Sequence, residues 1–465
     1  MLLRLEIDGF KNLIGFDAEF GPLTCIAGEN GIGKSNVFDA IQFLSLIADR
    51  PLIEAALQVR SNRSDSAGEP AHLFTAGGAD RLMKFAAEVL VPAEVVDDFD
   101  VPTTPSITIL RYEVEIGYEK PSNGSRHGRL VVEREQLRHI NRGDAHRHMR
   151  FPHSVKDFRN KVVDGRRSGG PFISTEVAER RITVHQDGGS RGRPRRALPT
   201  QASTTVVSTI NTVDDPTILA LRRELQSWRR LALEPSALRT ADRFVDPTTL
   251  GSDGRHLAAA LYRIAMQSPD GSTSEEVYAR VANRLSRLAG LDVRSLRVDT
   301  DDVRELLEVV VTDGHRGELP ARSLSEGTLR FLALCVALED PRMTGLITME
   351  EPENGIHPAN LPEMVQLVED LAVDPMKAPA PDNPLRQIII NTHSPGVVQL
   401  VDQADLLMAN ERFVDLDGSS VLALRLDGMS GTWRTPKSKG ATKADLLPYL
   451  ESPPGAQTKL QFDAA

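Results

Sequence analysis

Residues 28–35 read Gly28-Glu29-Asn30-Gly31-Ile32-Gly33-Lys34-Ser35, and this stretch decides the fold. It matches the pattern G-x-x-x-x-G-K-S, in which glycines let backbone N–H groups surround phosphate oxygens. The pattern requires a strand before it and a helix after it. The chain supplies an apolar run at 23–27 and apolar residues at helical spacing in 35–47. The stretch therefore predicts a phosphate-binding loop between a buried strand and a helix.

This loop predicts a role for each of its polar residues. Lys34 reaches the β- and γ-phosphate oxygens, and the Ser35 hydroxyl binds Mg²⁺. The helix that begins near Lys34 adds the positive end of its dipole to the site. The predicted ATP contacts are Asn30, Gly31, Gly33, Lys34, Ser35 and Asn36.

Two more apolar runs end in residues that carry chemistry. The run 346–349 predicts a buried strand followed by Glu350 and Glu351, and the run 388–390 predicts another that leads to His393. A strand end beside a phosphate loop is where a second Mg²⁺ ligand and a base that orients water are needed. We expect Glu350 in the metal shell, Glu351 at the attacking water and His393 near the γ-phosphate.

Ser325, Glu326 and Gly327 open a further predicted helix. A helix N-terminus suits an anion, but Ser325 also serves simply as a good N-cap. The spacing alone does not choose between these two roles.

These motifs occur in a fixed order along the chain, as GENGIGKS, LSEGTLRFLAL, ITMEEPENGIHP and NTHSP. The set resembles the ABC-type ATPases of the SMC, RecF and OLD branch, and most closely the stand-alone bacterial ATPases of that branch, many of them found in anti-phage loci. The resemblance covers residues 1–50 and 216–415. It implies an α/β P-loop head with a central, mostly parallel sheet, an antiparallel β lobe, a helical signature subdomain and a basic insertion.

The resemblance also implies that two heads enclose two ATP molecules. Ser325, Glu326 and Gly327 would then bind the γ-phosphate that the partner subunit's Lys34 holds. Glu351 would be the catalytic carboxylate and His393 the switch histidine. The sequence departs from the family in Glu350, where Asp is usual, in the Ser-Glu-Gly signature, and in lacking a recognisable Q-loop glutamine.

The pattern predicts five segments. Residues 1–95 form the first half of the head, 96–215 a basic insertion rich in strands and loops, and 216–320 a helical subdomain. Residues 321–437 complete the head, and 438–465 form a loosely held tail. Periodicity is weak in 138–200, where we expect mostly loops.

The net charge of −10 argues against a protein that coats nucleic acid, but residues 120–200 hold 19 Lys and Arg against 8 Asp and Glu. This local excess of positive charge allows contact with nucleic acid, docking of an acidic protein, or a merely solvated surface. The candidate contacts are Arg166, Arg167, Arg193, Arg195 and Arg196.

Other classes are excluded. No apolar run is long enough for a transmembrane helix, and Cys25 and Cys335 are too few for a disulfide framework. We expect a cytoplasmic homodimer, or a higher oligomer of heads, that uses ATP and Mg²⁺. The leading hypothesis is a regulator of a separate effector, a nuclease or toxin, in anti-phage defence. The alternatives are a RecF-like ATPase that binds DNA and a nucleotide-gated scaffold with little turnover.

Overall fold

The computed structural model describes residues 1–59, 70–75, 81–121, 128–187, 194–268, 271–288, 291–416, 418–435, 440–442 and 445. Most of the predicted tail at 438–465 lies outside these residues. No helix in the described ranges is both long and apolar enough to cross a membrane.

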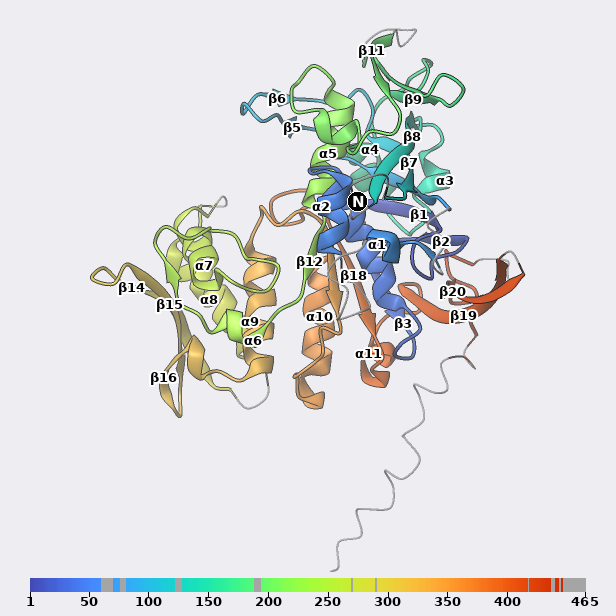
Figure 1. Cartoon of the computed structure of the whole chain (residues 1–465). Coiled ribbons are helices and arrows are strands. Elements are labelled where there is room, and N and C mark those ends of the chain that lie inside the picture. Colours follow the sequence, from blue (N-terminus) through green and yellow to red (C-terminus); the bar gives the residue numbers. More distant parts are fainter. Residues whose placement is uncertain are drawn as a thin grey trace, which may run out of the picture.

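A mixed sheet forms the centre of the molecule (Figure 1). Its strand order is β12-β17-β18-β3-β19-β20; all neighbours are parallel except the last pair, which forms an antiparallel hairpin. The strands are β3 (Leu23–Ala27), β12 (Arg229–Leu231), β17 (Gly345–Glu350), β18 (Arg386–Thr392), β19 (Leu406–Leu416) and β20 (Ser419–Gly428). Because β3, β17 and β18 are parallel neighbours, the three sequence motifs that follow them meet at one edge of the sheet.

An antiparallel sheet forms a second layer, at the top of Figure 1. Its strand order is β11-β10-β9-β8-β7-β4-β1-β2. The strands are β1 (Leu2–Asp8), β2 (Phe16–Glu19), β4 (Met83–Leu90), β7 (Ile109–Glu119), β8 (Arg129–His139), β9 (Ile173–Glu176), β10 (Arg181–His185) and β11 (Pro194–Pro199). The segment 96–215 thus continues the sheet that residues 1–95 begin, through the pairing of β4 with β7.

A helical lobe lies beside the central sheet, on the left of Figure 1. It contains α6 (Pro235–Leu238), α7 (Leu257–Met266), α8 (Ser274–Leu285) and α9 (Glu326–Glu339). These helices pack on a small sheet of β13 (Asp242–Arg243), β14 (Val293–Asp301), β15 (Leu306–Asp313) and β16 (Gly317–Pro320). Helix α8 begins with a capping box between Thr273 and Glu276, and Val277, Val281 and Leu285 form its buried stripe.

The remaining helices cover the sheets and connect them. They are α1 (Lys34–Ile47), α2 (Leu52–Gln58), α3 (Ala145–His148), α4 (Asn160–Val162), α5 (Pro216–Ser227), α10 (Leu361–Leu371) and α11 (Pro395–Leu400). Residues Val155–Arg159 form one π-helical turn before α4, and β5 (Val95–Val96) pairs with β6 (Pro102–Thr103).

Aromatic packing fixes helix α1 on the antiparallel sheet. The rings of Phe10, Phe43 and Phe85 lie with centroids 5.5–6.0 Å apart, and all three side chains are buried. Phe43 comes from α1 and Phe85 from β4, so the helix that follows the phosphate loop is held by an apolar core. Its N-terminus is therefore placed at the edge of the central sheet by packing rather than by propensity alone.

Candidate nucleotide-binding site

The phosphate loop runs from β3 to α1. Gly31 has φ +87° and Gly33 has φ +96°, both in the left-handed region that favours glycine. A Cβ on Gly33 would lie 2.3 Å from Nδ2 of Asn12, whereas nothing lies within 4 Å of one on Gly31. Asn12 Nδ2 also donates to the Ile32 carbonyl (3.1 Å), and Asn12 Oδ1 accepts from Asn36 (2.7 Å). The loop is thus shaped by its own glycines and by one asparagine from the β1–β2 turn.

Lys34 lies inside this loop. Its Nζ donates to the carbonyls of Gly28 and Glu29, each at 2.6 Å, and the residue is 5% exposed. Burial lowers the pKa of the Lys34 ammonium, and the nearby carboxylates of Glu351, Glu353, Glu29 and Glu350 oppose that shift. A phosphate group would supply the counter-charge and the hydrogen-bond acceptors that this buried cation can use.

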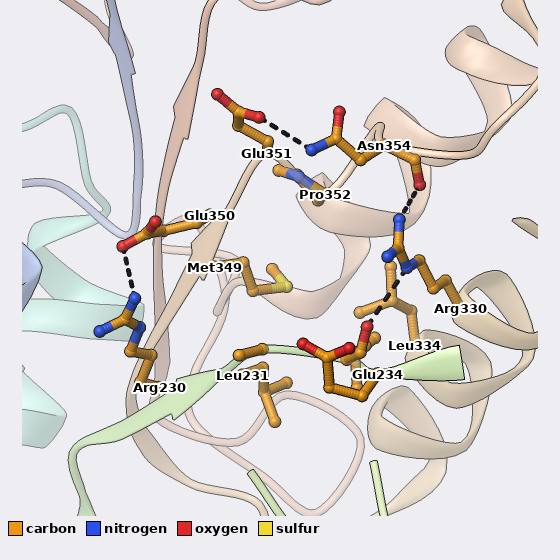
Figure 2. Close-up of a pocket in the computed structure, with 12 residues that line it drawn as sticks. Arg230, Leu231, Glu234, Arg330, Leu334, Met349, Glu350, Glu351, Pro352 and Asn354 are labelled. Carbon is orange, nitrogen blue, oxygen red and sulfur yellow. Dashed lines mark hydrogen bonds and ion pairs between the residues drawn. The ribbon is translucent and has the colours of Figure 1, made fainter. Parts of the chain in front are cut away.

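Glu350 ends strand β17 and pairs with an arginine from the neighbouring strand. Arg230 Nη2 lies 2.8 Å from Glu350 Oε1, and Arg230 Nη1 lies 3.2 Å from Asp39 Oδ1 (Figure 2). Asp39, on α1, is buried and also bonds Lys11 Nζ at 2.7 Å. An alternating chain of charges therefore joins α1 to the end of β17 through the edge strand β12.

Glu351 follows directly, and its backbone is strained at φ +45°. Its amide donates to the carbonyl and to Oδ1 of Asn391, each at 3.1 Å, which holds this conformation. Its carboxylate lies between two donors: Asn354 Nδ2 at 2.8 Å from Oε2, and His393 Nδ1 at 2.7 Å from Oε1. Burial acts to raise the pKa of this carboxyl, but the hydrogen bonds from Asn354 and His393 and the charge of Lys34 hold it below its usual value.

Glu353 also lies at this edge of the central sheet, where it is buried, with an exposed fraction of 7%. Its Oε1 accepts a short hydrogen bond from Thr392 Oγ1, which itself accepts from the Ser394 amide at 2.9 Å. Burial raises the pKa of Glu353, and the charge of Glu351 adds to that effect. Glu353 thus holds the turn that carries His393.

These residues fit a nucleotide with Mg²⁺. Ser35 is the second residue of α1, and the charge of the Glu350 carboxylate opposes the lowering of the Lys34 pKa. Hydroxyl and carboxylate oxygens are the hard donors that Mg²⁺ prefers. Asn30, Gly31 and Ile32 precede the helix as a turn, in which Asn30 and Gly31 are exposed, while Asn36 is turned inward to Asn12.

Ser325, Glu326 and Gly327 lie at the start of α9, in the helical lobe. Ser325 is the N-cap; its Oγ accepts from the Thr328 amide at 3.2 Å. Figure 1 shows α9 beside α6, with α10 between it and α1. Ser325 and Glu326 are exposed and Gly327 is buried, so the first two residues of the predicted signature face solvent.

A cavity of about 260 Å³ lies between α9 and the end of β17 (Figure 2). Polar groups from both sides line it: Arg230, Glu234, Arg330, Glu350, Glu351 and Asn354. Arg330 donates from Nε to the Leu233 carbonyl at 3.3 Å and from Nη1 to the Asn354 carbonyl.

The candidate arginines within residues 120–200 have different surroundings. Arg166 is exposed. Arg167 is 8% exposed; its guanidinium donates to the carbonyls of Gly170, Asp187 and Gln186 and stacks on Phe172 at 4.1 Å. The Arg167 guanidinium is therefore bonded within the protein, and we do not retain Arg167 as a candidate phosphate contact. Arg195 and Arg196 lie on β11, an edge strand, and Arg193 falls outside the described residues.

Sequence reasoning missed Asn12, Arg230, Arg330 and Asn354. Asn12 had a signal, because an asparagine in a tight turn between two strands is a frequent backbone ligand. The other three act through partners distant in sequence, and no local spacing indicates them.

The chain is similar in sequence to known proteins. A family model described as "AAA domain, putative AbiEii toxin, Type IV TA system" (AAA_21) matches residues 23–399. The DNA replication and repair protein RecF of Phocaeicola vulgatus is 44% identical over 46 residues, which make up 10% of this chain and only 12% of that protein.

Solved structures of SMC heads are also similar. One is an SMC head bound to the C-winged helix domain of ScpA, with 13% identity and a TM-score of 0.42, covering 91% of this chain and 97% of that one. Another is the SMC head domain from Thermotoga maritima, with 12% identity and a TM-score of 0.33, covering 91% and 98%.

Proposed function

Because the chain belongs to the AAA_21 family of P-loop ATPases, we propose that it hydrolyses ATP with Mg²⁺ at a site closed by a second copy of itself. The observation that carries the proposal is the position of the Glu351 carboxylate. It accepts hydrogen bonds from His393 and Asn354, and the charge of Lys34 helps to lower its pKa. These groups meet at the ends of three adjacent parallel strands.

The residues divide the chemistry among themselves. Lys34 and the amides of the loop bind the β- and γ-phosphates, while Ser35 and Glu350 hold Mg²⁺, which neutralises phosphate charge. Glu351 orients a water molecule for attack on the γ-phosphorus and accepts its proton as the bond to ADP breaks. His393 keeps Glu351 in place and faces the γ-phosphate, and Ser325, Glu326 and Gly327 reach the nucleotide of the partner subunit.

The test is turnover of Glu351→Gln against the wild type. We expect a loss in kcat of about 10²–10³-fold, as for removal of a general base, with nucleotide binding retained. Glu411→Gln, an exposed position on β19, is the matched control. A wild type no faster than Glu351→Gln contradicts hydrolysis and favours the nucleotide-gated scaffold.

We further propose that this ATPase regulates a separate effector, a nuclease or toxin, in a bacterial defence system. The family description, which names a toxin of a Type IV system, supports this role. Co-expression with the protein encoded beside it tests the role. Lys34→Ala should release that protein's toxicity to the host if the ATPase restrains the effector, and should abolish the toxicity if the ATPase activates the effector. Identical growth with wild type and Lys34→Ala contradicts it.

A second candidate is a DNA-repair ATPase, favoured by the similarity to RecF over 46 residues and by the exposed Arg166. Joint charge reversal of Arg166, Arg195 and Arg196 should then weaken DNA binding and reduce its salt dependence. Arg304→Glu, exposed in the helical lobe, is the control. Unchanged affinity contradicts this candidate.

A further inference from the structure

Helix α9 contacts two consecutive residues of the loop after β17, Asn354 and Gly355. A Cβ on Gly327 would lie 2.4 Å from the Gly355 carbonyl oxygen, so the helix start lies directly against this loop. One turn further on, the guanidinium of Arg330 donates to the carbonyl of Asn354. The side chain of Arg330 also bonds the Leu233 carbonyl, so its head is held from two directions.

The same loop holds the carboxylate of Glu351. Asn354 donates from its side chain to Glu351 Oε2 at 2.8 Å and from its backbone to the Glu351 carbonyl at 3.0 Å. Figure 2 shows Asn354 between Glu351 on one side and Arg330 on the other. Its backbone oxygen thus faces the signature helix while its amide group faces the carboxylate.

We propose that Arg330 and Asn354 are positioning residues through which helix α9 sets the Glu351 carboxylate of its own subunit. This rests on the proposed function, in which Glu351 orients the attacking water. Removing the Arg330 contact frees the loop, and removing the Asn354 amide frees one oxygen of the carboxylate. Neither residue touches the phosphate loop, so nucleotide binding does not depend on them.

The consequence is communication between two active sites. The signature at the start of α9 belongs to the nucleotide held by the partner subunit, whereas Glu351 serves the nucleotide of its own subunit. A shift of α9 when it meets the partner's nucleotide therefore reaches the other site through Arg330 and Asn354.

The first measurement is hydrogen exchange in the nucleotide-free protein, which requires no turnover. The amides of Asn354 and Ile356 bond to the carbonyls of Glu351 and Glu353 within this loop. We expect Arg330→Met to speed their exchange by about tenfold, because it removes the external support of the loop. Arg322→Met, an exposed arginine just before the signature, is the matched control and should leave this exchange unchanged.

The second measurement is steady-state hydrolysis. Asn354→Ala and Arg330→Met should each lower kcat about tenfold or more, as loss of a supporting hydrogen bond does in other sites, with KM for ATP within about twofold. Arg330→Lys keeps a donor and should recover most of kcat. Asn354 is exposed, so its variant tests the idea without threatening the fold.

The outcomes separate this inference from the proposed function. Unchanged exchange in Arg330→Met overturns the inference, whatever the ATPase activity is. So does a hydrolysing wild type whose kcat survives both Asn354→Ala and Arg330→Met. A wild type that does not hydrolyse ATP contradicts the proposed function, and the exchange of the loop amides alone then decides whether Arg330 holds the loop.

Discussion

At the residue scale, Lys34 gives the most direct prediction. ATP with Mg²⁺ at about a hundred times its Kd should stabilise the wild type by about 2.7 kcal/mol, since it binds only the folded state. Lys34→Ala should abolish this stabilisation, because the buried ammonium is the main positive charge that the loop offers to phosphate. Thermal unfolding with and without nucleotide measures it. Lys84→Ala, exposed on β4, should respond to ATP as the wild type does; a shift retained in Lys34→Ala contradicts the site.

The strand-end residues were predictable for a simple reason. Lys34, Glu350, Glu351 and His393 each follow an apolar run, and parallel strands bring their carboxyl ends to one edge. Arg330 and Asn354 were not predictable, because the contact between them is made by a backbone carbonyl. Any residue type at position 354 has that carbonyl, so the sequence carries no sign of it.

At the scale of the element, the two phosphate-loop glycines with positive φ allow backbone strain to be distinguished from a steric clash. Gly31→Ala and Gly33→Ala both force a side chain into the left-handed region, at about 1 kcal/mol each. Only Gly33→Ala also drives a Cβ into Asn12. We expect Gly33→Ala to cost about 1 kcal/mol more than Gly31→Ala and to weaken ATP binding further, as judged by urea unfolding and nucleotide titration.

The double variant Asn12→Ala/Gly33→Ala checks the cause. If the collision with Asn12 is responsible, the double variant destabilises the protein by less than the sum of the two single variants. Strict additivity would mean that the collision plays no part.

The strand β8 contributes a buried acid with a pH-dependent effect on stability. Glu135 accepts hydrogen bonds from the Val206 and Val207 amides and from the Tyr112 hydroxyl, and burial raises its pKa from 4.5 to about 7. Between these two values the folded state keeps a proton that the unfolded state has lost, so stability falls as pH rises.

We therefore expect the wild type to lose about 1.5 kcal/mol between pH 5.5 and 7 through this group, relative to Glu135→Gln, which stays neutral. Urea unfolding of both proteins at several pH values measures the difference. Parallel pH profiles for the two proteins would contradict a raised pKa at Glu135.

The elements themselves were predictable to different degrees. The runs 23–27, 346–349 and 388–390 became β3, β17 and β18, because a fully buried parallel strand is a continuous apolar run. The stretch 138–200 was expected to be mostly loop, yet β9 and β11 lie in it beside β10. Both are short, and β11 is an edge strand, so neither needs the apolar alternation by which a strand is recognised.

At the scale of the whole molecule, ion pairs with distant parts of the chain neutralise part of the positive charge in residues 120–200. Arg134 pairs with Glu115 and Arg150 pairs with Glu19, so acids from outside residues 120–200 neutralise bases within that range. A count of charges along the sequence could not show this, since the partners come from other strands of the sheet. The excess that remains available to a partner is smaller than the composition suggests.

The pairing of two chains is the property on which the proposed mechanism depends most, and mixed variants test it. A Lys34→Ala chain keeps a sound signature, and a Ser325→Arg chain keeps a sound phosphate loop and Glu351. Each variant alone should be inactive. With random exchange of chains, an equal mixture should recover about a quarter of wild-type activity, because half of the pairs carry one complete site of two.

The control mixture combines Lys34→Ala with Glu351→Gln. Lys34 and Glu351 serve the same nucleotide from the same chain, so no pairing of these two variants yields a complete site, and activity should stay absent. Recovery in the control mixture would place Glu351 across the interface. No recovery in the first mixture, in chains shown by mass to have exchanged, would mean that Ser325 does not complete a partner's site. Activity per chain should also fall on dilution, because the complete site exists only in the pair.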